Sequence, residues 1–498
     1  MSSATQNGRQ PELRSSRFPT VRRVLRWRGW RVIACVLLGV VVVGGIVDGV
    51  ATVHYGRRVK AKLEALRAAG KPLLGRDIAP KPVPAADNAA PLYLTAAEII
   101  KVHGKSNGSA PTDQPAEVPR EEVGYSRYNW NDPEDLAVLA EYVRQDHRAL
   151  DLLQDATSRP AAVFDIDWDR GIETPLPHLA KLRLTARFLS AAAIVAAHQG
   201  NQAEALDRVR MGFVVARHTS GDPSLIGQLV VIAIDGITRR AAEYVLAQGP
   251  VPEDAARRLA AELQRVDYRQ RYAVAMQGER VIGLDAFSRV RSGRNLDAIL
   301  GDAEVGRSRR DRLYVWAYSR LLRPVVYADE LQYLQCLDEL ETYGSLTLRE
   351  RASARTTPDG EPPVPRWAIV TRTMVPASSR IDLRFEVASA QRRLLQTALG
   401  LQVYCQRHGR YPAALSELRG TSWVAPVDNF SEQDLVYRRQ GASYLLYSVG
   451  PNLKDDGGRP HWLQLPKAAP PPEPPSIASA GDLVWPEPGV PQPNGLPK

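Results

Sequence analysis

One apolar stretch constrains the chain more than any other feature. Residues 32–53 (VIACVLLGVVVVGGIVDGVATV) carry no charge except that of Asp48. As a helix they would extend about 33 Å, roughly the thickness of the hydrocarbon core of a bilayer. Five arginines and two tryptophans lie within residues 22–31, an arrangement typical of a membrane–water interface. We therefore expect a single transmembrane helix in contact with membrane lipid through residues 32–53.

The sequence favours an uncleaved anchor with its N-terminus in the cytoplasm. A cleaved signal peptide would have a shorter apolar core and a small-residue A-x-A site, and no such site closes this run. Basic residues lie on both sides of the stretch, but a short arginine-rich tail is costly to translocate, whereas long domains cross largely regardless of charge. Asp48 is expected to snorkel to the interface; the alternative is a functional acid inside the membrane.

The net charge of +10 does not indicate a nucleic-acid-binding protein. Residues 1–31 contain eight arginines and one acid, so most of the excess lies in this tail. We expect no nucleic-acid partner. Of the three cysteines, Cys35 is in the apolar stretch, and the sequence leaves Cys336 and Cys405 either as one disulfide or, as we expect, as two free thiols.

Helical periodicity dominates the chain after the anchor. Residues 54–91 predict a helix and then a proline-rich spacer that holds the domain off the membrane. Residues 125–350 show scarcely any strand-like alternation. Asn131 is expected to cap a helix whose apolar face continues to Leu150 and Leu153. In the same region, residues 177–198 and 203–218 form two helical patterns joined by a turn at Gly200-Asn201, which predicts an antiparallel α-hairpin.

This hairpin resembles the turn and second helix of a tetratricopeptide repeat. The resemblance lies in Gly200 at the turn, Ala205 as the small residue of the second helix, and Val209 and Phe213 on its packing face. No clean second copy follows at a 34-residue period, so an ordinary α-hairpin is the alternative. The resemblance implies helical pairs that stack into a curved array.

The pattern changes after residue 380. Residues 381–408 predict one helix, followed by the sequence HGRYP, a short helix at 413–418 and two strands within 435–449. This order of elements resembles the periplasmic part of the major pseudopilin of type II secretion. The matching residues are His408, Gly409, Arg410, Tyr411, Pro412, Tyr437, Tyr447, Ser448, Gly450 and the segment 455–458. Unlike a pseudopilin, the chain has its anchor more than 300 residues upstream, which puts assembly into a pilus rod in doubt.

The pseudopilin resemblance also implies a calcium site. In that family the loop after the last strand can bind calcium, and the matching oxygen donors are Asp428, Asn452, Asp455 and Asp456. Calcium needs six or more oxygen ligands, so backbone carbonyls and water would have to complete this set. The alternative is a hydrated Asx/Gly turn. We expect no other cofactor.

The last segment, residues 466–498, is rich in proline and is expected to be a disordered or polyproline tail. The predicted organisation is a mainly α chain with a small C-terminal α+β module. Its parts are a basic cytoplasmic tail (1–31), a transmembrane helix (32–53), a juxtamembrane helix and spacer (54–91), a helical domain (92–355), a pseudopilin-like module (380–465) and the tail (466–498).

Catalytic motifs are not evident in the sequence. The alternating acids Asp165, Asp167 and Asp169 would share one face of a strand, where they could bind a cation or act as catalytic carboxylates; a solvated edge is the alternative. His178, His198 and His218 recur every 20 residues, but they fall at different helix ends and do not predict a metal site.

These features together predict a scaffold or adaptor of the bacterial inner membrane rather than an enzyme. Its helical domain, outside the cytoplasm, would bind a protein partner of the cell envelope. Because the C-terminal module resembles a pseudopilin, we expect this partner to belong to a secretion or pilus-type system. The alternative is an envelope hydrolase that uses the acids of the helical domain.

Overall fold

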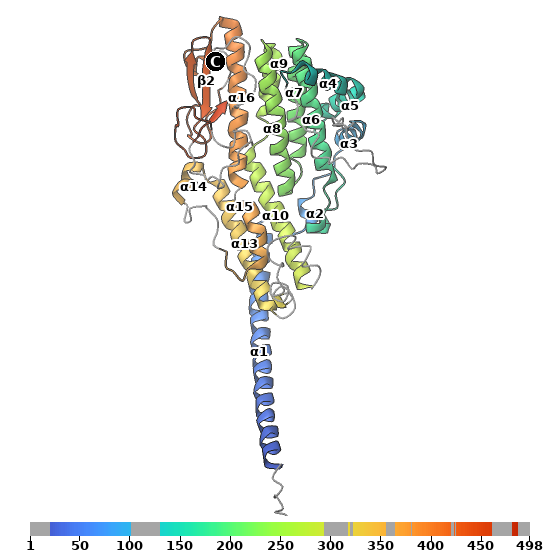
Figure 1. Cartoon of the computed structure of the whole chain (residues 1–498), viewed down its shortest axis with the longest axis vertical. Coiled ribbons are helices and arrows are strands. Elements are labelled where there is room, and N and C mark those ends of the chain that lie inside the picture. Colours follow the sequence, from blue (N-terminus) through green and yellow to red (C-terminus); the bar gives the residue numbers. More distant parts are fainter. Residues whose placement is uncertain are drawn as a thin grey trace, which may run out of the picture.

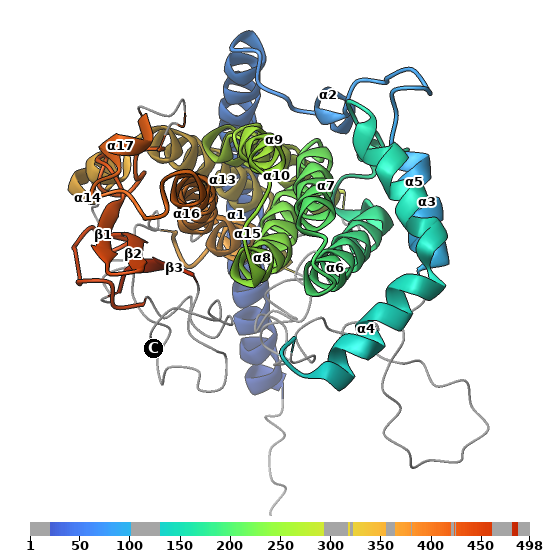
Figure 2. The same ribbon diagram turned by 90° about the horizontal axis from the view of Figure 1, so that it is seen from above.

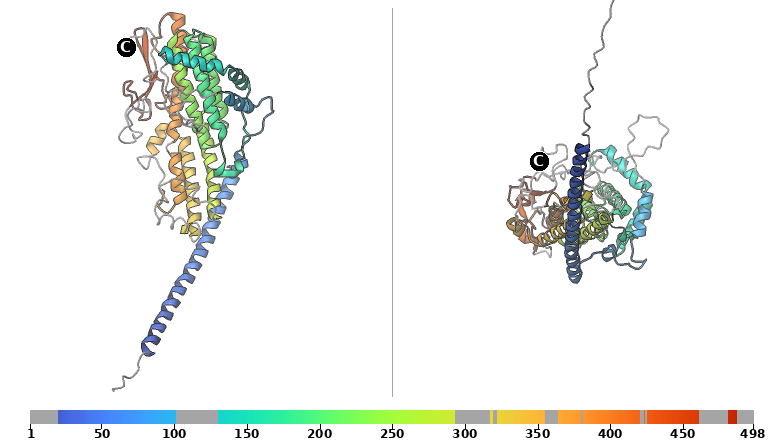
Figure 3. Two further views of the ribbon diagram at one scale, coloured as in Figure 1. Left: turned by 45° about the vertical axis from the view of Figure 1, so that its right-hand side comes forward. Right: turned by 90° about the horizontal axis from the view of Figure 1, so that it is seen from below.

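The computed structural model describes residues 20–100, 130–292, 317–318, 322–354, 364–379, 381–419, 423, 425–460 and 481–486. These residues are mostly helical, with one small three-stranded sheet, which confirms the predicted mainly α class. Figures 1 and 3 show a long N-terminal helix that leaves one end of an elongated domain and extends well beyond it.

The N-terminal helix, α1, runs without a break over Thr20–Ala68. It joins the predicted transmembrane segment to the helix predicted after it, and it includes residues 20–31 of the predicted tail. The side chains of its apolar segment are exposed, as at Val41 (69%), whereas Val59 and Leu66 are buried. Among the described residues α1 is the one helix that is long and apolar enough to cross a membrane, and it fits a transmembrane or signal anchor.

The first part of the predicted spacer packs against the domain. Leu73 is buried, and the short helix α2 (Gly75–Ile78) packs on the 3-10 helix η2 (Trp168–Glu173). The contact is so close that a Cβ atom on Gly75 would lie 2.1 Å from the carbonyl oxygen of Trp168. The proline-rich composition predicted an extended chain, but it did not reveal this packing.

The remaining helices include the two of the predicted hairpin and the predicted helix at 381–408. They are α3 (Ala90–Ile99), α4 (Pro133–Gln145), α5 (His147–Ser158), α6 (Pro177–His198), α7 (Gln202–Thr219), α8 (Leu225–Gln248), α9 (Glu253–Leu263), α10 (Tyr268–Arg291), α13 (Arg323–Ser345), α14 (Leu348–Ala354), α15 (Ile369–Ser379), α16 (Ile381–His408) and α17 (Ser416–Arg419). Figure 2 shows the long helices running side by side, with α3, α4 and α5 curving around α6 and α7.

The predicted α-hairpin is present as α6 and α7, and both of its helices pack on α8. The element that extends this packing is α16, which contacts α8, α9 and α10. Leu394 and Leu395 of α16 share one apolar core with Phe213, Val245 and Leu259. The predicted boundary between the helical domain and the module at 380–465 is therefore not a boundary between separate cores.

The sheet consists of antiparallel strands in the order β1 (Val436–Gln440), β2 (Ser443–Ser448) and β3 (Leu483–Trp485). The first two form the predicted hairpin. The third lies within the tail that was expected to be disordered, and this prediction is wrong for residues 481–486. Leu483 and Trp485 enter the apolar core, which fixes the strand. Residues 461–480 and 487–498, and residues 1–19 of the predicted cytoplasmic tail, lie outside the described residues.

Glu330 of α13 makes the stability of the fold depend on pH. Its side chain is buried; one carboxylate oxygen pairs with Arg291, and the other has no hydrogen-bond partner among the described residues. Burial raises the pKa of Glu330 from 4.5 to about 7, although Arg291 acts to lower it. Between these two values the folded chain keeps a proton that the unfolded chain has lost, so stability falls as the pH rises through this window.

We therefore expect the free energy of unfolding to fall less between pH 4.5 and 7 in Glu330→Gln than in the unchanged chain. The full effect of this group is about 3 kcal/mol. Urea unfolding of the detergent-solubilised chain at a series of pH values measures it. Glu339→Gln, an exposed position on the same helix, is the matched control. An unchanged pH slope in Glu330→Gln would contradict the raised pKa.

Candidate binding cleft

One cleft among the described residues has a volume of about 770 Å³. It lies where the α9–α10 junction and α16 meet the loop that precedes β1. We call it the central cleft. Its lining is Leu263, Gln264, Val266, Asp267, Tyr268, Arg269, Thr347, Glu386, Ser389, Arg392, Arg393, Gln396, Pro426, Val427, Asp428, Asn429 and Glu432.

A buried ion pair forms the floor of the central cleft. Arg392 of α16 donates from Nε and Nη2 to the carboxylate of Asp235 on α8, with Nη2 2.7 Å from Oδ1. Its Nη1 donates to the carbonyl of Leu263 at 3.0 Å, and Tyr268 donates its hydroxyl to Asp235. Burial alone would lower the pKa of Arg392, but the Asp235 carboxylate raises it above its ordinary value. This cluster fixes four helices, α8, α9, α10 and α16, relative to one another.

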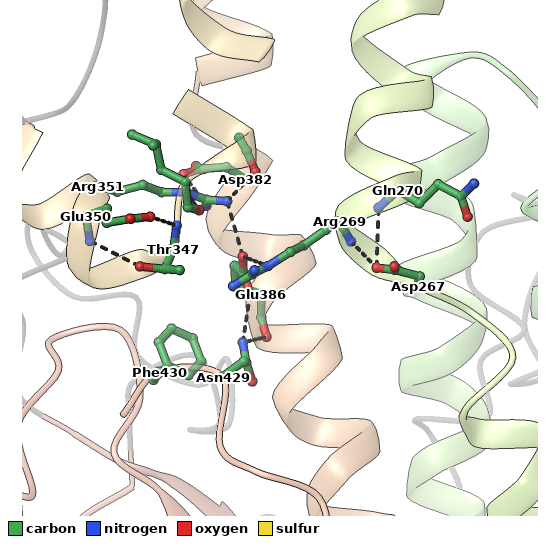
Figure 4. Close-up of polar contacts among 12 residues, drawn as sticks. Asp267, Arg269, Gln270, Thr347, Glu350, Arg351, Asp382, Glu386, Asn429 and Phe430 are labelled. Carbon is green, nitrogen blue, oxygen red and sulfur yellow. Dashed lines mark hydrogen bonds and ion pairs between the residues drawn. The ribbon is translucent and has the colours of Figure 1, made fainter. Parts of the chain in front are cut away.

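Glu386 connects the walls of the central cleft (Figure 4). Its Oε1 lies 3.3 Å from Nη2 of Arg351, on α14, and 3.6 Å from Nε of Arg269, on α10. Its Oε2 accepts a hydrogen bond of 2.8 Å from Nδ2 of Asn429, in the loop before β1. A single carboxylate on α16 thus holds three elements that are far apart in the sequence.

Groups suited to binding remain in the central cleft. Asn429 is 5% exposed, and its Oδ1 has no hydrogen-bond partner in the described part of the chain. A buried acceptor of this kind favours a donor from a ligand or a water molecule. The side chain of Arg269 is 45% exposed at the wall. A guanidinium and a free amide oxygen can bind a peptide or another polar ligand by hydrogen bonds.

Two of the carboxylates that line the central cleft have structural roles. Its lining, as far as the chain is described, contains no histidine or cysteine. Asp267 caps α10 by accepting from the backbone N–H of Arg269 at 2.9 Å, and Glu386 is held in ion pairs. A catalytic acid or base needs a carboxylate that is free to exchange a proton with a substrate. Asp267 and Glu386 are not free in this way, whereas Glu432, which also lines the cleft, is exposed.

Asp428, the first of the four predicted calcium ligands, is fully buried and holds the loop before β1 in place. Its carboxylate accepts from Phe430 N at 3.1 Å, Ser431 Oγ at 3.0 Å, Ser448 Oγ at 2.7 Å and Val449 N at 3.3 Å. These bonds join the loop to the end of β2. Each carboxylate oxygen accepts two of them, so Asp428 acts as a buried anchor of the fold.

The other three predicted ligands lie in the loop after β2. Asn452 donates to Asp456 Oδ2 at 2.8 Å, and Asp455 Oδ1 accepts from the Tyr447 hydroxyl at 2.7 Å. Asp456 also accepts from Gly481 N at 2.7 Å, which ties this loop to β3. The structure does not bring Asp428, Asp455 and Asp456 into one metal-binding group, and no other such group occurs among the described residues. Calcium binding stays a prediction.

The segment with the alternating acids is not a strand. Residues 162–167 have no regular secondary structure, and η2 begins at Trp168. Asp165, Asp167 and Asp169 are all exposed, as the alternation indicated. Asp167 caps η2, and Asp169 accepts from Arg76 N at 3.0 Å, which joins η2 to α2. No observation on these acids favours the hydrolase alternative.

In the described part of the chain, two of the three histidines make buried contacts, and neither cysteine outside the apolar stretch is paired. His178 Nε2 lies 3.0 Å from Asp222 Oδ2, and His218 Nδ1 lies 2.9 Å from the Tyr93 hydroxyl. Burial lowers the pKa of His218 to about 3. Cys336 and Cys405 are free thiols, so the expectation of two unpaired thiols agrees with the structure.

The sequence analysis did not identify the residues that build the central cleft. Arg392 follows Phe385 and Ala388 on the apolar stripe of α16, and Asp235 interrupts the apolar run of α8. A charge at a core position of a helix is a signal that a partner must exist. The partner lies 157 residues away, so the sequence alone could not pair them.

Comparison with protein-family models, with curated proteins and with solved structures found no match. The function of the chain is therefore argued from its anchor and its cleft.

Proposed function

We propose that the chain is a single-pass membrane protein of the bacterial cell envelope that acts as a scaffold or adaptor. One observation carries the proposal: α1 is a single helix whose residues 32–53 are apolar and mostly exposed, and whose last turns pack on the domain through Val59 and Leu66. A helix that is continuous through both environments transmits the orientation of the membrane segment to the domain. The cleft is then held at a fixed place above the bilayer.

Ion pairs support this rigid connection. Lys62 of α1 pairs with Asp338 of α13, and Lys71, just beyond α1, pairs with Glu341 at 2.8 Å. Gly56 lies against the ring of Tyr327, so the contact begins about one turn after the apolar segment. In this proposal the N-terminus is cytoplasmic and the domain lies on the outer side of the inner membrane.

The partner in this proposal is a protein of a secretion or pilus-type system. The order of α16, the HGRYP turn, α17 and the β1–β2 hairpin supports the resemblance to a pseudopilin. The packing of α16 on α8 and α9 favours fixed display of this part over assembly into a rod. The partner binds in the central cleft, where Arg269 and the Oδ1 atom of Asn429 offer hydrogen bonds to its backbone.

Anchoring is tested by placing charge in the apolar segment. Val41→Arg with Val43→Arg is expected to move the chain out of the membrane fraction, because each arginine costs about 3 kcal/mol at the centre of a membrane helix. The change from Val41 and Val43 to leucine is the matched control and is expected to stay in the membrane. An N-terminal tag that is lost from the mature protein would contradict an uncleaved anchor.

Binding is tested in the same membranes by photo-crosslinking. A benzoylphenylalanine at Ser389, which lines the central cleft, is expected to crosslink to a subunit of a secretion or pilus-type machine. The same residue at Gln335, exposed on α13, is the control and is expected not to do so. Equal crosslinking from both positions, or none from Ser389, would contradict binding in the cleft.

A further inference from the structure

A second groove, away from the central cleft, is lined by arginines. It has a volume of about 500 Å³ and lies between the end of α5, the middle of α7 and α9. We call it the arginine groove. Its charged lining is Arg159, Arg210, Arg217, Arg258, Arg265 and Glu262. Five guanidinium groups and one carboxylate make this an unusually basic surface for a domain whose charge is otherwise nearly balanced.

The single carboxylate is already occupied. Glu262 is 5% exposed; its Oε1 accepts from Arg217 Nε at 2.7 Å, and its Oε2 lies 3.7 Å from Arg265 Nε. Arg217 also donates from Nη1 to the carbonyl of Pro160 at 3.2 Å. One buried negative charge is thus shared by two arginines, and it leaves an excess of positive charge beside it.

Arg159 adds a positive charge that its own hydrogen bonds do not neutralise. Its Nη1 donates to the carbonyls of Ala85 and Asn88, at 3.1 and 2.7 Å. Carbonyl oxygens fix the side chain but carry no formal charge. Because the bonds hold this half-buried guanidinium in place, little side-chain entropy is lost when it binds an anion.

The two arginines on the rim are paired with acids outside the groove. Arg210 bonds to Asp207 at 2.9 Å, and Arg258 bonds to Asp254 at 2.6 Å. When these acids and Glu262 are counted against the five arginines, the groove keeps two uncompensated positive charges. Guanidinium groups bind phosphate and carboxylate through parallel N–H donors, so their ligand is expected to be an oxyanion.

We propose that the arginine groove binds a small soluble ligand that carries two or more phosphate groups. The volume of the groove is within the range of small-molecule sites. A membrane lipid carries the same chemistry, but α5, α7 and α9 lie in the half of the domain away from α1 (Figure 1), so the anchoring bilayer does not reach the groove. This site is independent of the partner proposed for the central cleft.

Inorganic tripolyphosphate is the probe, titrated by calorimetry into the full chain in nanodiscs. Arg159→Gln and Arg258→Gln are each expected to weaken its binding about tenfold, the usual effect of losing one charge-assisted contact. Arg144→Gln is the matched control, because it removes the same charge from an exposed pair outside the groove. Arg258 is 55% exposed, so its replacement tests the groove even if Arg159→Gln fails to fold.

The outcomes separate the proposal from its alternatives. Binding that is lost in both groove variants and kept in Arg144→Gln supports it. No heat with tripolyphosphate would show that the arginines only stabilise the end of α5. Equal loss of affinity in all three variants would show that they attract anions non-specifically. Affinity is expected to be equal in neutral and anionic nanodiscs; a loss in anionic nanodiscs alone would assign the groove to a lipid headgroup and overturn a soluble ligand.

Discussion

Arg392→Met is expected to lower the free energy of unfolding by about 3–5 kcal/mol, the usual cost of removing one partner of a buried ion pair. The substitution keeps most of the side-chain volume, but it leaves the Asp235 carboxylate without its cation. The two side chains are 5% and 7% exposed, so water cannot take the place of the guanidinium. The Tyr268 hydroxyl would be the remaining donor to this carboxylate. Urea unfolding of the detergent-solubilised chain measures the difference.

Two further variants make this result specific. Arg144→Met removes an exposed partner of Glu141 and is expected to change stability by less than about 1 kcal/mol. Asp235→Leu combined with Arg392→Met replaces both charges by apolar groups and is expected to recover most of the loss, because no buried charge is left unpaired. If Arg392→Met cost no more than Arg144→Met, the ion pair could not be the buried floor of the central cleft.

The Arg392–Asp235 ion pair shows which features of the fold the sequence could predict and which it could not. The predicted bounds of α6 and α16 agree with the structure because each helix begins and ends at a local signal, a proline at the start of α6 and the glycine and proline of HGRYP after α16. The apolar stripe of α16 was also visible. The stripe could not reveal that Arg392 lies within it to meet Asp235, because the pairing depends on the tertiary fold.

Local breaks were harder to predict than helices. One helix was expected from Asn131 onward, but Asp132 is the cap, accepting from Glu134 N, and the helix ends at Gln145. A new helix, α5, begins at His147. The apolar positions continue across this break with nearly helical spacing, so periodicity could not show it. The break turns α5 onto α3, which contributes Tyr93 to the core.

The candidate sites also differ in whether the local sequence could reveal them. The acids at 165–169 are exposed, as the solvated alternative has it, but they do not share the face of a strand, because η2 begins at Trp168. The central cleft and the arginine groove were missed, because each is assembled from elements far apart in the chain. Asp428 illustrates the difference: its contacts with Ser448 and Val449 give it a structural role in the loop that the sequence did not reveal.

Trp485→Ala is expected to have the second large effect on the free energy of unfolding. It tests strand β3, which the proline-rich composition of residues 466–498 did not reveal. Trp485 is 6% exposed and lies in β3 opposite Leu446 of β2. Its removal leaves a large cavity in the core that α16 shares with the sheet, which is expected to cost about 3–5 kcal/mol. A disordered tail would predict no loss. Trp367→Ala, at a position that is 40% exposed, is the control and is expected to cost much less.

Hydrogen exchange adds a local measurement to this prediction. Loss of β3 would leave β2 as an edge strand, so the amide protons of Tyr447 and its neighbours in β2 are expected to exchange faster in Trp485→Ala than in Trp367→Ala. Ser448 pairs with Leu483 and also bonds to Asp428, so the loop that forms one wall of the central cleft should loosen as well. Unchanged exchange in β2 with unchanged stability would mean that residues 483–485 do not pair with the sheet in solution.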